Sequence, residues 1–356
     1  MGVIYDKAMS DTSRHPIKAY KHFNMIMEID IAGAFIYNGI KELEAMESLY
    51  YESEIFMFLY NISVGIERLQ KVLIVLSENI LCEDIEEFEK SLITHSHQDL
   101  HDRIKEKIDM NFNSRQNSFL QVLNTFYNRC RYERFNIKGQ YNYEKELLLD
   151  YINKNLNNEL IERDMFVNEI NTIHIKEVLG RVIGFISRTY YRSIYKIASK
   201  QNLYTYELRS GSKSQKVFLS QVRKNSLYNQ LLNEQIAAKE LLVFLINSKH
   251  KNGFYKFIKE IKPLKIDVAL VNSYLESIFK GDIPNDLVDE MEYLYGEHNY
   301  SKDRIEMINC IGNSRIDFDF IIVESLREIL ESLIFNKCKI DTSVDKFLCI
   351  VEYLED

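Results

Sequence analysis

Residues that make turns are scarce in this chain. Three prolines and 12 glycines occur among its 356 residues, and positions 17–262 contain no proline. Folds rich in β-sheet need turn residues about every 8–12 positions. This scarcity excludes a sheet-rich architecture and predicts an all-α fold.

Long uncharged apolar runs are also missing. The most hydrophobic window, 55–76, contains Glu67, Arg68 and Lys71, whereas a membrane-spanning helix needs about 18 or more apolar residues with few charges. The first thirty residues carry charges and lack the apolar core of a signal peptide. The five cysteines include no CxxC pair, which indicates unpaired thiols in a reducing compartment. We therefore expect a cytoplasmic protein that does not enter a membrane.

Several motifs of known chemistry are absent. The chain has no P-loop, no GxGxxG, no GxSxG nucleophile elbow and no EF-hand loop. Each of these would have indicated a nucleotide, a cofactor, a serine nucleophile or a calcium ion. We predict no cofactor.

What the chain does have is apolar residues at helical spacing. The pattern predicts long helices at 29–49 and 50–78 and one or two helices at 166–201. Near the C-terminus it predicts helices at 268–279, 284–295, 302–311, 318–336 and 343–354. Gly65, inside the second helix, is a candidate for a close helix crossing. We divide the chain into an N-terminal arm (1–22), a helical bundle (23–142), a helical region (143–260) and an acidic helical C-terminal region (261–356).

The segment 118–136 joins an apolar helical face to a concentration of arginines. Its second half holds Arg129, Arg131 and Arg134, with Glu133 as the single acid. Guanidinium groups make planar, multi-donor contacts to phosphate oxygens, and they stabilise the charge that develops when a phosphodiester is attacked. The segment therefore predicts a phosphate-binding helix. The alternative is a solvated basic face paired with the acids of residues 83–89.

Three histidines lie just upstream, at His95, His97 and His101. A histidine near the arginines would accept a proton from a ribose 2′-hydroxyl or donate one to the leaving oxygen. His97 and His101 share a helix face, as zinc ligands often do, but no HExxH motif and no nearby cysteine accompanies them. We assign no metal ligands; a catalytic role and a structural role in capping the helix both stay open.

A family resemblance rests on three segments of this region. FYNRCRYERFN (126–136) is preceded by YNISVGIERLQKVLIVL (60–76) and HSHQDLH (95–101). Over about residues 25–140 the chain resembles the HEPN superfamily, small helical domains of RNA-cleaving toxins and phage-defence proteins. The resemblance implies RNA as the substrate, cleavage without a metal ion, and a homodimer that brings two motifs into one cleft.

The chain departs from the HEPN motif at one position. The family carries an arginine followed, after four to six residues, by a histidine. Arg131 matches the arginine, but Asn136 stands where the histidine belongs. Asparagine can hold a phosphate or a 2′-hydroxyl, yet it cannot act as a general base near neutral pH. Either His97 or His101 supplies the proton transfer, or the chain is a non-cleaving relative.

A second basic segment spans residues 188–224, where nine cations face one acid although the whole chain has a net charge of −8. Its helical part repeats cations at steps of four with tyrosines between them: Arg188, Tyr191, Arg192, Tyr195, Lys196 and Lys200. Cations for phosphates and aromatic rings for bases are typical of single-stranded RNA binding. The alternative is that the tyrosines face the core while the basic stems cover apolar surface.

Together these patterns predict an RNA-binding, all-α protein with a HEPN-like bundle and a larger helical C-terminal region. It would cleave RNA as part of a toxin or antiviral defence system, with a protein partner from that system. The alternative is a non-catalytic scaffold or adaptor that dimerises and binds nucleic acid or a protein. The predicted catalytic residues are Arg131, Asn136, His97 and His101, and the predicted RNA contacts are Arg129, Arg134, Arg188, Tyr191, Arg192, Tyr195, Lys196 and Lys200.

Overall fold

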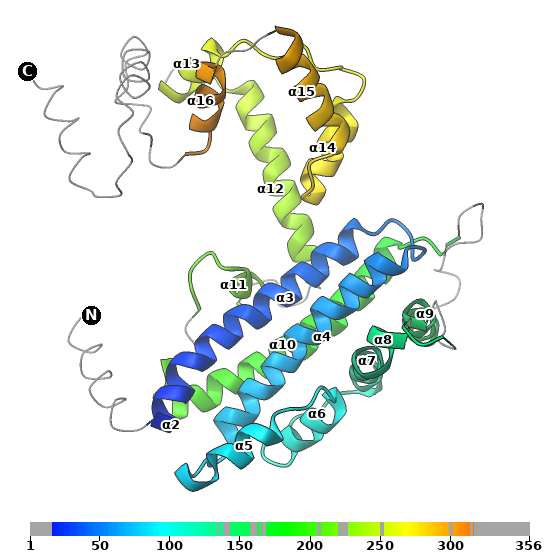
Figure 1. Ribbon diagram of the computed structural model, residues 1–356, viewed down its shortest axis with the longest axis vertical. Helices are drawn as coiled ribbons and strands as arrows, with labels where there is room; N and C mark the ends of the chain where they lie inside the picture. The colour runs from blue at the N-terminus through cyan, green and yellow to red at the C-terminus, as the bar shows by residue number, and fades with distance from the viewer. Residues whose placement is uncertain are drawn as a thin grey trace, which may run out of the picture. The chain divides into compact units, whose positions relative to one another are not determined.

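The computed structural model describes residues 16–133, 135–137, 143–156, 162–163, 165, 169–204, 208–219, 227–249, 253–298, 302–313 and 316. These residues form helices, with two isolated β-bridges and no sheet, which confirms the all-α prediction. Figure 1 shows the helices in chain order. Their bounds are α2 (Pro16–Ala19), η1 (Tyr20–Asn24), α3 (Met25–Ala45), α4 (Glu52–Ser77), η2 (Cys82–Asp84), α5 (Ile85–Ser91), α6 (His97–Lys105), α7 (Ser114–Thr125), η3 (Phe126–Cys130), α8 (Arg131–Glu133), α9 (Tyr143–Asn155), α10 (Ile173–Lys200), α11 (Lys213–Phe218), α12 (Leu227–Asn247), α13 (Gly253–Glu260), α14 (Val271–Lys280), α15 (Asn285–His298) and α16 (Lys302–Cys310).

The chain divides into two compact units, Met1–Ala238 and Lys239–Asp356, and the division falls within α12. The expected boundaries at 142 and 260 do not coincide with it. Residues on both sides of 142 share one hydrophobic core, because α9 and α10 pack against α4. The segment expected to form the boundary near 260 contains helix α13.

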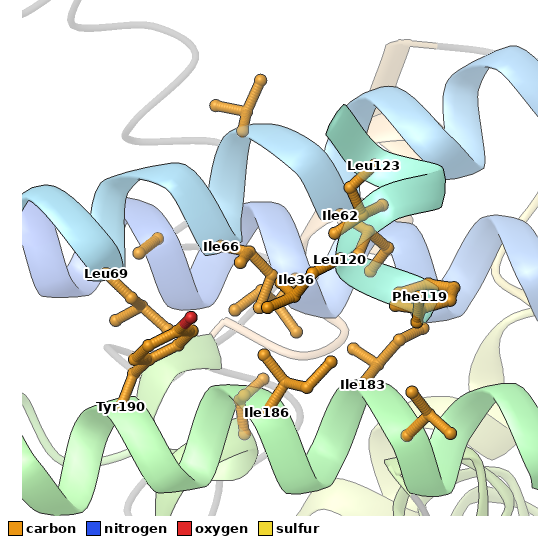
Figure 2. Close-up of a cluster of buried hydrophobic side chains, with 14 of the residues drawn as sticks. Ile36, Ile62, Ile66, Leu69, Phe119, Leu120, Leu123, Ile183, Ile186 and Tyr190 are labelled. Atoms are coloured by element: carbon orange, nitrogen blue, oxygen red, sulfur yellow. The ribbon is translucent and has the colours of Figure 1, made fainter. Parts of the chain in front are cut away.

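Three long helices, α3, α4 and α10, form the centre of the first unit (Figure 1). The short connection between Ala45 and Glu52 makes α3 and α4 antiparallel neighbours. Each presents apolar residues at three- and four-residue steps, and these positions are buried. Figure 2 shows side chains from α3, α4, α7 and α10 converging in this core, among them Ile36, Ile66, Leu120 and Ile186.

Close approach of α3 and α4 depends on a glycine. A Cβ placed on Gly65 would lie 2.6 Å from Cγ1 of Ile36 and 2.9 Å from the carbonyl oxygen of Ala32. Both distances are far inside van der Waals contact, so only glycine fits without a shift of the neighbouring helix. The predicted close crossing at Gly65 is therefore confirmed.

Helices α6 and α7 pack beside α4, and each begins at a side-chain cap. The side chain of Ser96 accepts a hydrogen bond from the backbone N–H of Asp99 and starts α6 at His97. Asn113 caps α7 in a capping box with Gln116. Asn113 Oδ1 accepts from the backbone N–H groups of Arg115 and Gln116 in the first turn.

The second unit contains the end of α12 and helices α13 to α16. Helices predicted at 268–279, 284–295 and 302–311 correspond to α14, α15 and α16. Those predicted at 318–336 and 343–354 lie outside the described residues. In the part of the chain that the structure describes, no helix combines the length and the apolar composition that a membrane crossing requires.

Candidate functional site

The predicted phosphate-binding helix, here called the arginine helix, spans residues 114–133 and changes from α-helical to π-helical geometry at residues 126–130. After α7 the chain continues as the π-helical turn η3, in which the N–H of Arg131 donates to the carbonyl of Phe126, five residues back. A π-turn changes the direction of the side chains that follow, and such turns are frequent at functional sites. Here Tyr127 is buried, and the guanidinium of Arg131 lies over its ring, 4.0 Å from the centroid.

Arg131 is held by aromatic groups. Its Nη2 donates to the hydroxyl of Tyr132 at 2.9 Å, and its Cζ also lies 4.8 Å from the centre of that ring. Among the described residues no acid lies within ion-pairing distance of Arg131 or of the exposed Arg129. Pairing of these two arginines with the acids of 83–89 is thus not observed. A cation stacked on a ring keeps its charge and most of its donors for an anion.

A histidine lies on the same tyrosine. The ring of His95 is 4.8 Å from that of Tyr127, and its Nδ1 lies 3.1 Å from Oε2 of Glu67. The Glu67 carboxylate is largely buried and also accepts a hydrogen bond of 2.7 Å from Lys71. The His95 side chain is 50% exposed. With the carboxylate accepting from Nδ1–H, the lone pair of the imidazole stands on Nε2, as in a histidine oriented for proton transfer.

We call Glu67, Lys71, His95, Tyr127 and Arg131 the Tyr127 site. Three parts of the chain build it: α4 supplies the acid and the lysine, the loop before α6 supplies the histidine, and η3 with α8 supplies the tyrosine and the arginine. Together they place an arginine and a carboxylate-bound histidine on one aromatic ring, with Lys71 on the same carboxylate. That combination suits an anionic substrate that must gain or lose a proton.

A groove of about 460 Å³ begins at this site and follows α4. Its floor consists of buried valines of α4; one wall comes from α3, and the other from Leu92, His95 and Tyr127. We call it the α4 groove, and its lining residues are Tyr20, Asn24, Met25, Glu28, Phe35, Tyr60, Val64, Glu67, Arg68, Lys71, Val72, Val75, Leu92, His95 and Tyr127.

The two histidines expected to transfer protons are closed to solvent. His97 is 0% and His101 1% exposed. His97 Nδ1 lies 3.0 Å from Oε1 of Gln70, and His101 Nδ1 lies 2.8 Å from the hydroxyl of Tyr190. Burial lowers the pKa of each ring to about 4. Neither ring lies where a substrate can touch it, so the structure does not support a catalytic role for them.

Gln70 ties the two histidines into one buried network. Its Nε2 donates to the backbone carbonyl of His97 at 2.9 Å and to the Tyr190 hydroxyl at 3.0 Å. These bonds fix the amide orientation, so its Oε1 accepts from Nδ1–H of His97, and Tyr190 donates its hydrogen to His101. The remaining nitrogen of His97, Nε2, is buried without a partner. The network joins α4, α6 and α10.

The other predicted residues of the arginine helix lie toward solvent or outside the described part. Asn136 is exposed just beyond α8, and its backbone N–H donates to the carbonyl of Glu133 at 3.0 Å. Arg129 is exposed. Arg134 lies outside the described residues. The structure thus gives Asn136 no described partner within the Tyr127 site.

The predicted basic face of α10 separates into a buried and an exposed part. Arg188 donates from Nε to the carbonyl of Val217 at 3.1 Å, and Tyr191 is buried against Phe218 with ring centres 4.7 Å apart. These two residues therefore contribute to packing. Arg192, Lys196 and Lys200 are exposed, and Tyr195 is about half exposed. Four of the six predicted contacts on this helix are exposed: Arg192, Tyr195, Lys196 and Lys200.

Other cations of the 188–224 segment contact residues elsewhere in the first unit. Lys216 pairs with Glu234 at 2.9 Å, Lys213 donates to Asn38 at 2.8 Å, and Arg209 lies 4.0 Å from Asp30. The open positive surface of this segment is thus smaller than its sequence suggests. Among the described residues, no group of three or more histidine, cysteine or acidic side chains could hold a metal ion.

The sequence patterns did not select Glu67, Lys71 or Tyr127 as site residues, and of the three neighbouring histidines they favoured His97 and His101 over His95. A signal was present, because Glu67 and Lys71 are charged residues inside a long, largely apolar helix, and such residues are almost never buried unless they are paired. The cap at Ser96 leaves His95 outside the helix that contains His97 and His101. Recognising this helix start in the sequence would have distinguished His95 from the other two histidines. Comparison of this chain with protein-family models, with curated proteins and with solved structures finds no match.

Proposed function

We propose that this chain is an RNA-binding protein that cleaves RNA without a metal ion at the Tyr127 site. The observation that carries the proposal is the contact of one ring, Tyr127, with both a half-exposed His95–Glu67 pair and Arg131. HEPN membership over 25–140, a cytoplasmic location, and a toxin or antiviral-defence setting with a protein partner belong to this proposal and rest on the sequence.

In the proposed reaction His95 Nε2 accepts the proton of a ribose 2′-hydroxyl. The 2′-oxygen then bonds to the adjacent phosphorus while the bond from phosphorus to the 5′-oxygen breaks. The proton taken up by His95 passes to that leaving oxygen, which yields a 2′,3′-cyclic phosphate and a 5′-hydroxyl. Arg131 and Lys71 oppose the negative charge that builds on the phosphoryl oxygens, and Glu67 stabilises the imidazolium.

The exposed cations of α10 support the RNA-binding part of the proposal. Arg192, Lys196 and Lys200 present three positive charges beside the half-exposed ring of Tyr195. Each phosphate neutralised on a single strand contributes about −0.7 to the slope of log affinity against log salt. Replacing these three cations with glutamine should flatten that slope by about two units. The same change at the exposed Lys256, Lys259 and Lys262 is the matched control.

Cleavage is tested with the full chain, a fluorescent RNA and excess EDTA. We expect products with 2′,3′-cyclic phosphate ends. His95→Ala should slow single-turnover cleavage by about 10²-fold or more, the usual contribution of a general acid–base group. Arg131→Ala should also slow cleavage, because it removes a cation that opposes the negative charge on the phosphoryl oxygens. His174→Ala and Arg181→Ala, which change exposed residues of the same types, should stay within about threefold, well below that contribution.

Two results would overturn the catalytic claim. One is intact RNA after incubation with a pure, folded preparation. The other is cleavage that proceeds at the same rate in His95→Ala and Arg131→Ala. Salt-sensitive binding without turnover would leave the RNA-binding part standing alone.

One feature favours a non-catalytic scaffold as the second candidate. Tyr132, Phe135 and Ile137 are large apolar side chains that stand exposed next to Arg131. Exposed apolar groups that cluster favour contact with another protein surface, here a second copy. Light scattering after size exclusion tests this, since Phe135→Asp should shift a dimer toward the monomer while Ile93→Asp, at another exposed site, should not.

A further inference from the structure

We infer that the α4 groove is a nucleotide-binding pocket, with the phosphate at the Tyr127 site and the base further along α4. This inference deepens the proposed function, because it uses the same site for the phosphate. It adds a specific chamber for one base, and therefore a base preference. The size, the walls and the charge of the groove support this inference.

The size and the walls suit one flat ring. Pockets for small ligands occupy about 300–1,000 Å³, and the groove has about 460 Å³. Its floor of Val64, Val72 and Val75 is apolar, and the half-buried rings of Phe35 and Tyr60 are among the residues that line it. Aromatic walls over an apolar floor favour stacking of a base, which every nucleobase can provide through its π-face.

The charges inside the groove nearly cancel. Glu28 pairs with Arg68, and Glu67 pairs with Lys71 and His95. A chamber whose acids and bases balance does not attract a polyanion along its length. It does suit an uncharged base, because carboxylates accept hydrogen bonds from exocyclic amino groups.

The two ends of the groove differ in electrostatic character. Tyr127, with Arg131 over its ring, lies at the end of the groove that begins with Tyr60, and Lys71 lies further along α4 on the Glu67 carboxylate. At the other end Tyr20 lies near Glu89 and Glu28, and burial together with these two acids raises the pKa of its hydroxyl. A phosphate is therefore favoured only at the Tyr127 end. The base then lies in the groove against the apolar floor and the rings of Phe35 and Tyr60.

The same chemistry could come from a free mononucleotide or from one residue of an RNA strand. Calorimetric titration of the intact protein with AMP, GMP, CMP and UMP addresses the first source, with ribose 5-phosphate and inorganic phosphate as ligands that lack a base. We expect a single site at which AMP, GMP and CMP bind at least about fivefold more tightly than ribose 5-phosphate, the lower end of the effect of base stacking. UMP, which has no exocyclic amine, should bind more weakly than CMP.

Short oligoribonucleotides of one base type address the second source. If the pocket takes a residue of RNA only, mononucleotides will not bind, but oligo(A) and oligo(C) will bind or be cleaved in preference to oligo(U). Val64→Phe, which fills the floor, should abolish this preference and any mononucleotide binding. Tyr51→Leu, an exposed aromatic outside the groove, should change neither. Thermal unfolding of both variants identifies a loss caused by misfolding, in which case Phe35→Ala takes the place of Val64→Phe.

Failure of the inference and failure of the proposed function give different results. Cleavage of RNA without base preference, with no mononucleotide binding and no effect of Val64→Phe, overturns the pocket and leaves the nuclease. Mononucleotide binding that Val64→Phe removes, in a protein that neither binds nor cleaves RNA, supports the pocket and overturns the nuclease.

Discussion

The guanidinium of Arg131 lies over the ring of Tyr127, with 4.0 Å between Cζ and the ring centroid. The same ring lies 4.8 Å from that of His95. One buried side chain therefore sets the positions of a cation and an imidazole that come from different helical segments. The π-helical turn η3 is what brings Arg131 into this place, because it changes the direction of the side chains that follow Phe126.

Removing the ring beneath Arg131 should weaken the site without removing a charge. A cation–π contact contributes about 0.5–2 kcal/mol, so Tyr127→Leu should lower RNA affinity and the cleavage rate by about 3- to 30-fold. Tyr127→Phe keeps the ring and should retain most of both. Fluorescence anisotropy and single-turnover cleavage measure the two quantities. Equal behaviour of the Leu and Phe variants would contradict a role for the ring.

The buried network around Tyr190 should stabilise the first unit. Tyr190→Phe leaves the side-chain amide of Gln70 and Nδ1 of His101 without their shared partner. An unsatisfied buried polar group costs about 1–3 kcal/mol, and the free energy of unfolding in urea should fall by that amount. Tyr51→Phe is the control, because Tyr51 is exposed and its ring lies edge to face against that of Tyr50. A loss as large in Tyr51→Phe would refute the explanation.

Stability should fall in mild acid because two histidines are buried in the neutral form. Burial lowers the pKa of His97 and His101 to about 4, whereas a histidine in the unfolded chain titrates near about 6.5. Between these values the unfolded state binds more protons than the folded state. The contribution of both rings is therefore complete above about pH 6.5 and is lost as the pH falls through 4.

Urea unfolding at pH 7.5, 6, 5 and 4.5 measures this dependence. The double variant His97→Gln, His101→Phe should lose stability less steeply over that range than the unsubstituted protein, whatever its stability at pH 7.5. A control with His174→Gln, an exposed histidine, should follow the unsubstituted curve. Parallel curves for all three proteins would show that other groups set the acid response.

The crossing of α3 and α4 gives a prediction with an internal control. Gly65→Ala places a methyl group 2.6 Å from Ile36, and overpacking of this kind costs about 1–3 kcal/mol. Gly296 lies in α15 with nothing within 4 Å of its added Cβ. Gly296→Ala should be neutral or stabilising by up to about 1 kcal/mol, the gain in helix propensity. Thermal unfolding that shows no difference between the two variants would contradict the close crossing.

The basic face of α10 shows what sequence periodicity does not predict. Steps of four place Arg188, Arg192, Lys196 and Lys200 along one side of a helix, and α10 does form as one helix. The spacing of these four cations does not predict how exposed each of them is. Arg188 lies beside α11 and bonds to its backbone, while the three cations after it point to solvent. Periodicity describes one helix, whereas exposure depends on the neighbours that pack against it.

The sequence by itself determined the fold class and most of the helices. Scarce proline and glycine exclude frequent turns, and apolar residues at helical steps must be buried on one face, so those positions dictate helices wherever they pack. The same pattern indicated that His97 and His101 are buried, since they share a face of α6 with the apolar Leu100 and Ile104.

Only the tertiary structure decided which polar groups meet. The cap at Ser96 starts α6 at His97 and leaves His95 in the preceding loop, where it reaches Glu67 of α4. His95 and His97 are two positions apart, yet the imidazole of His95 is open to solvent and that of His97 is enclosed in the core. Contacts between distant segments depend on where helices begin and how they pack, and no local spacing records either.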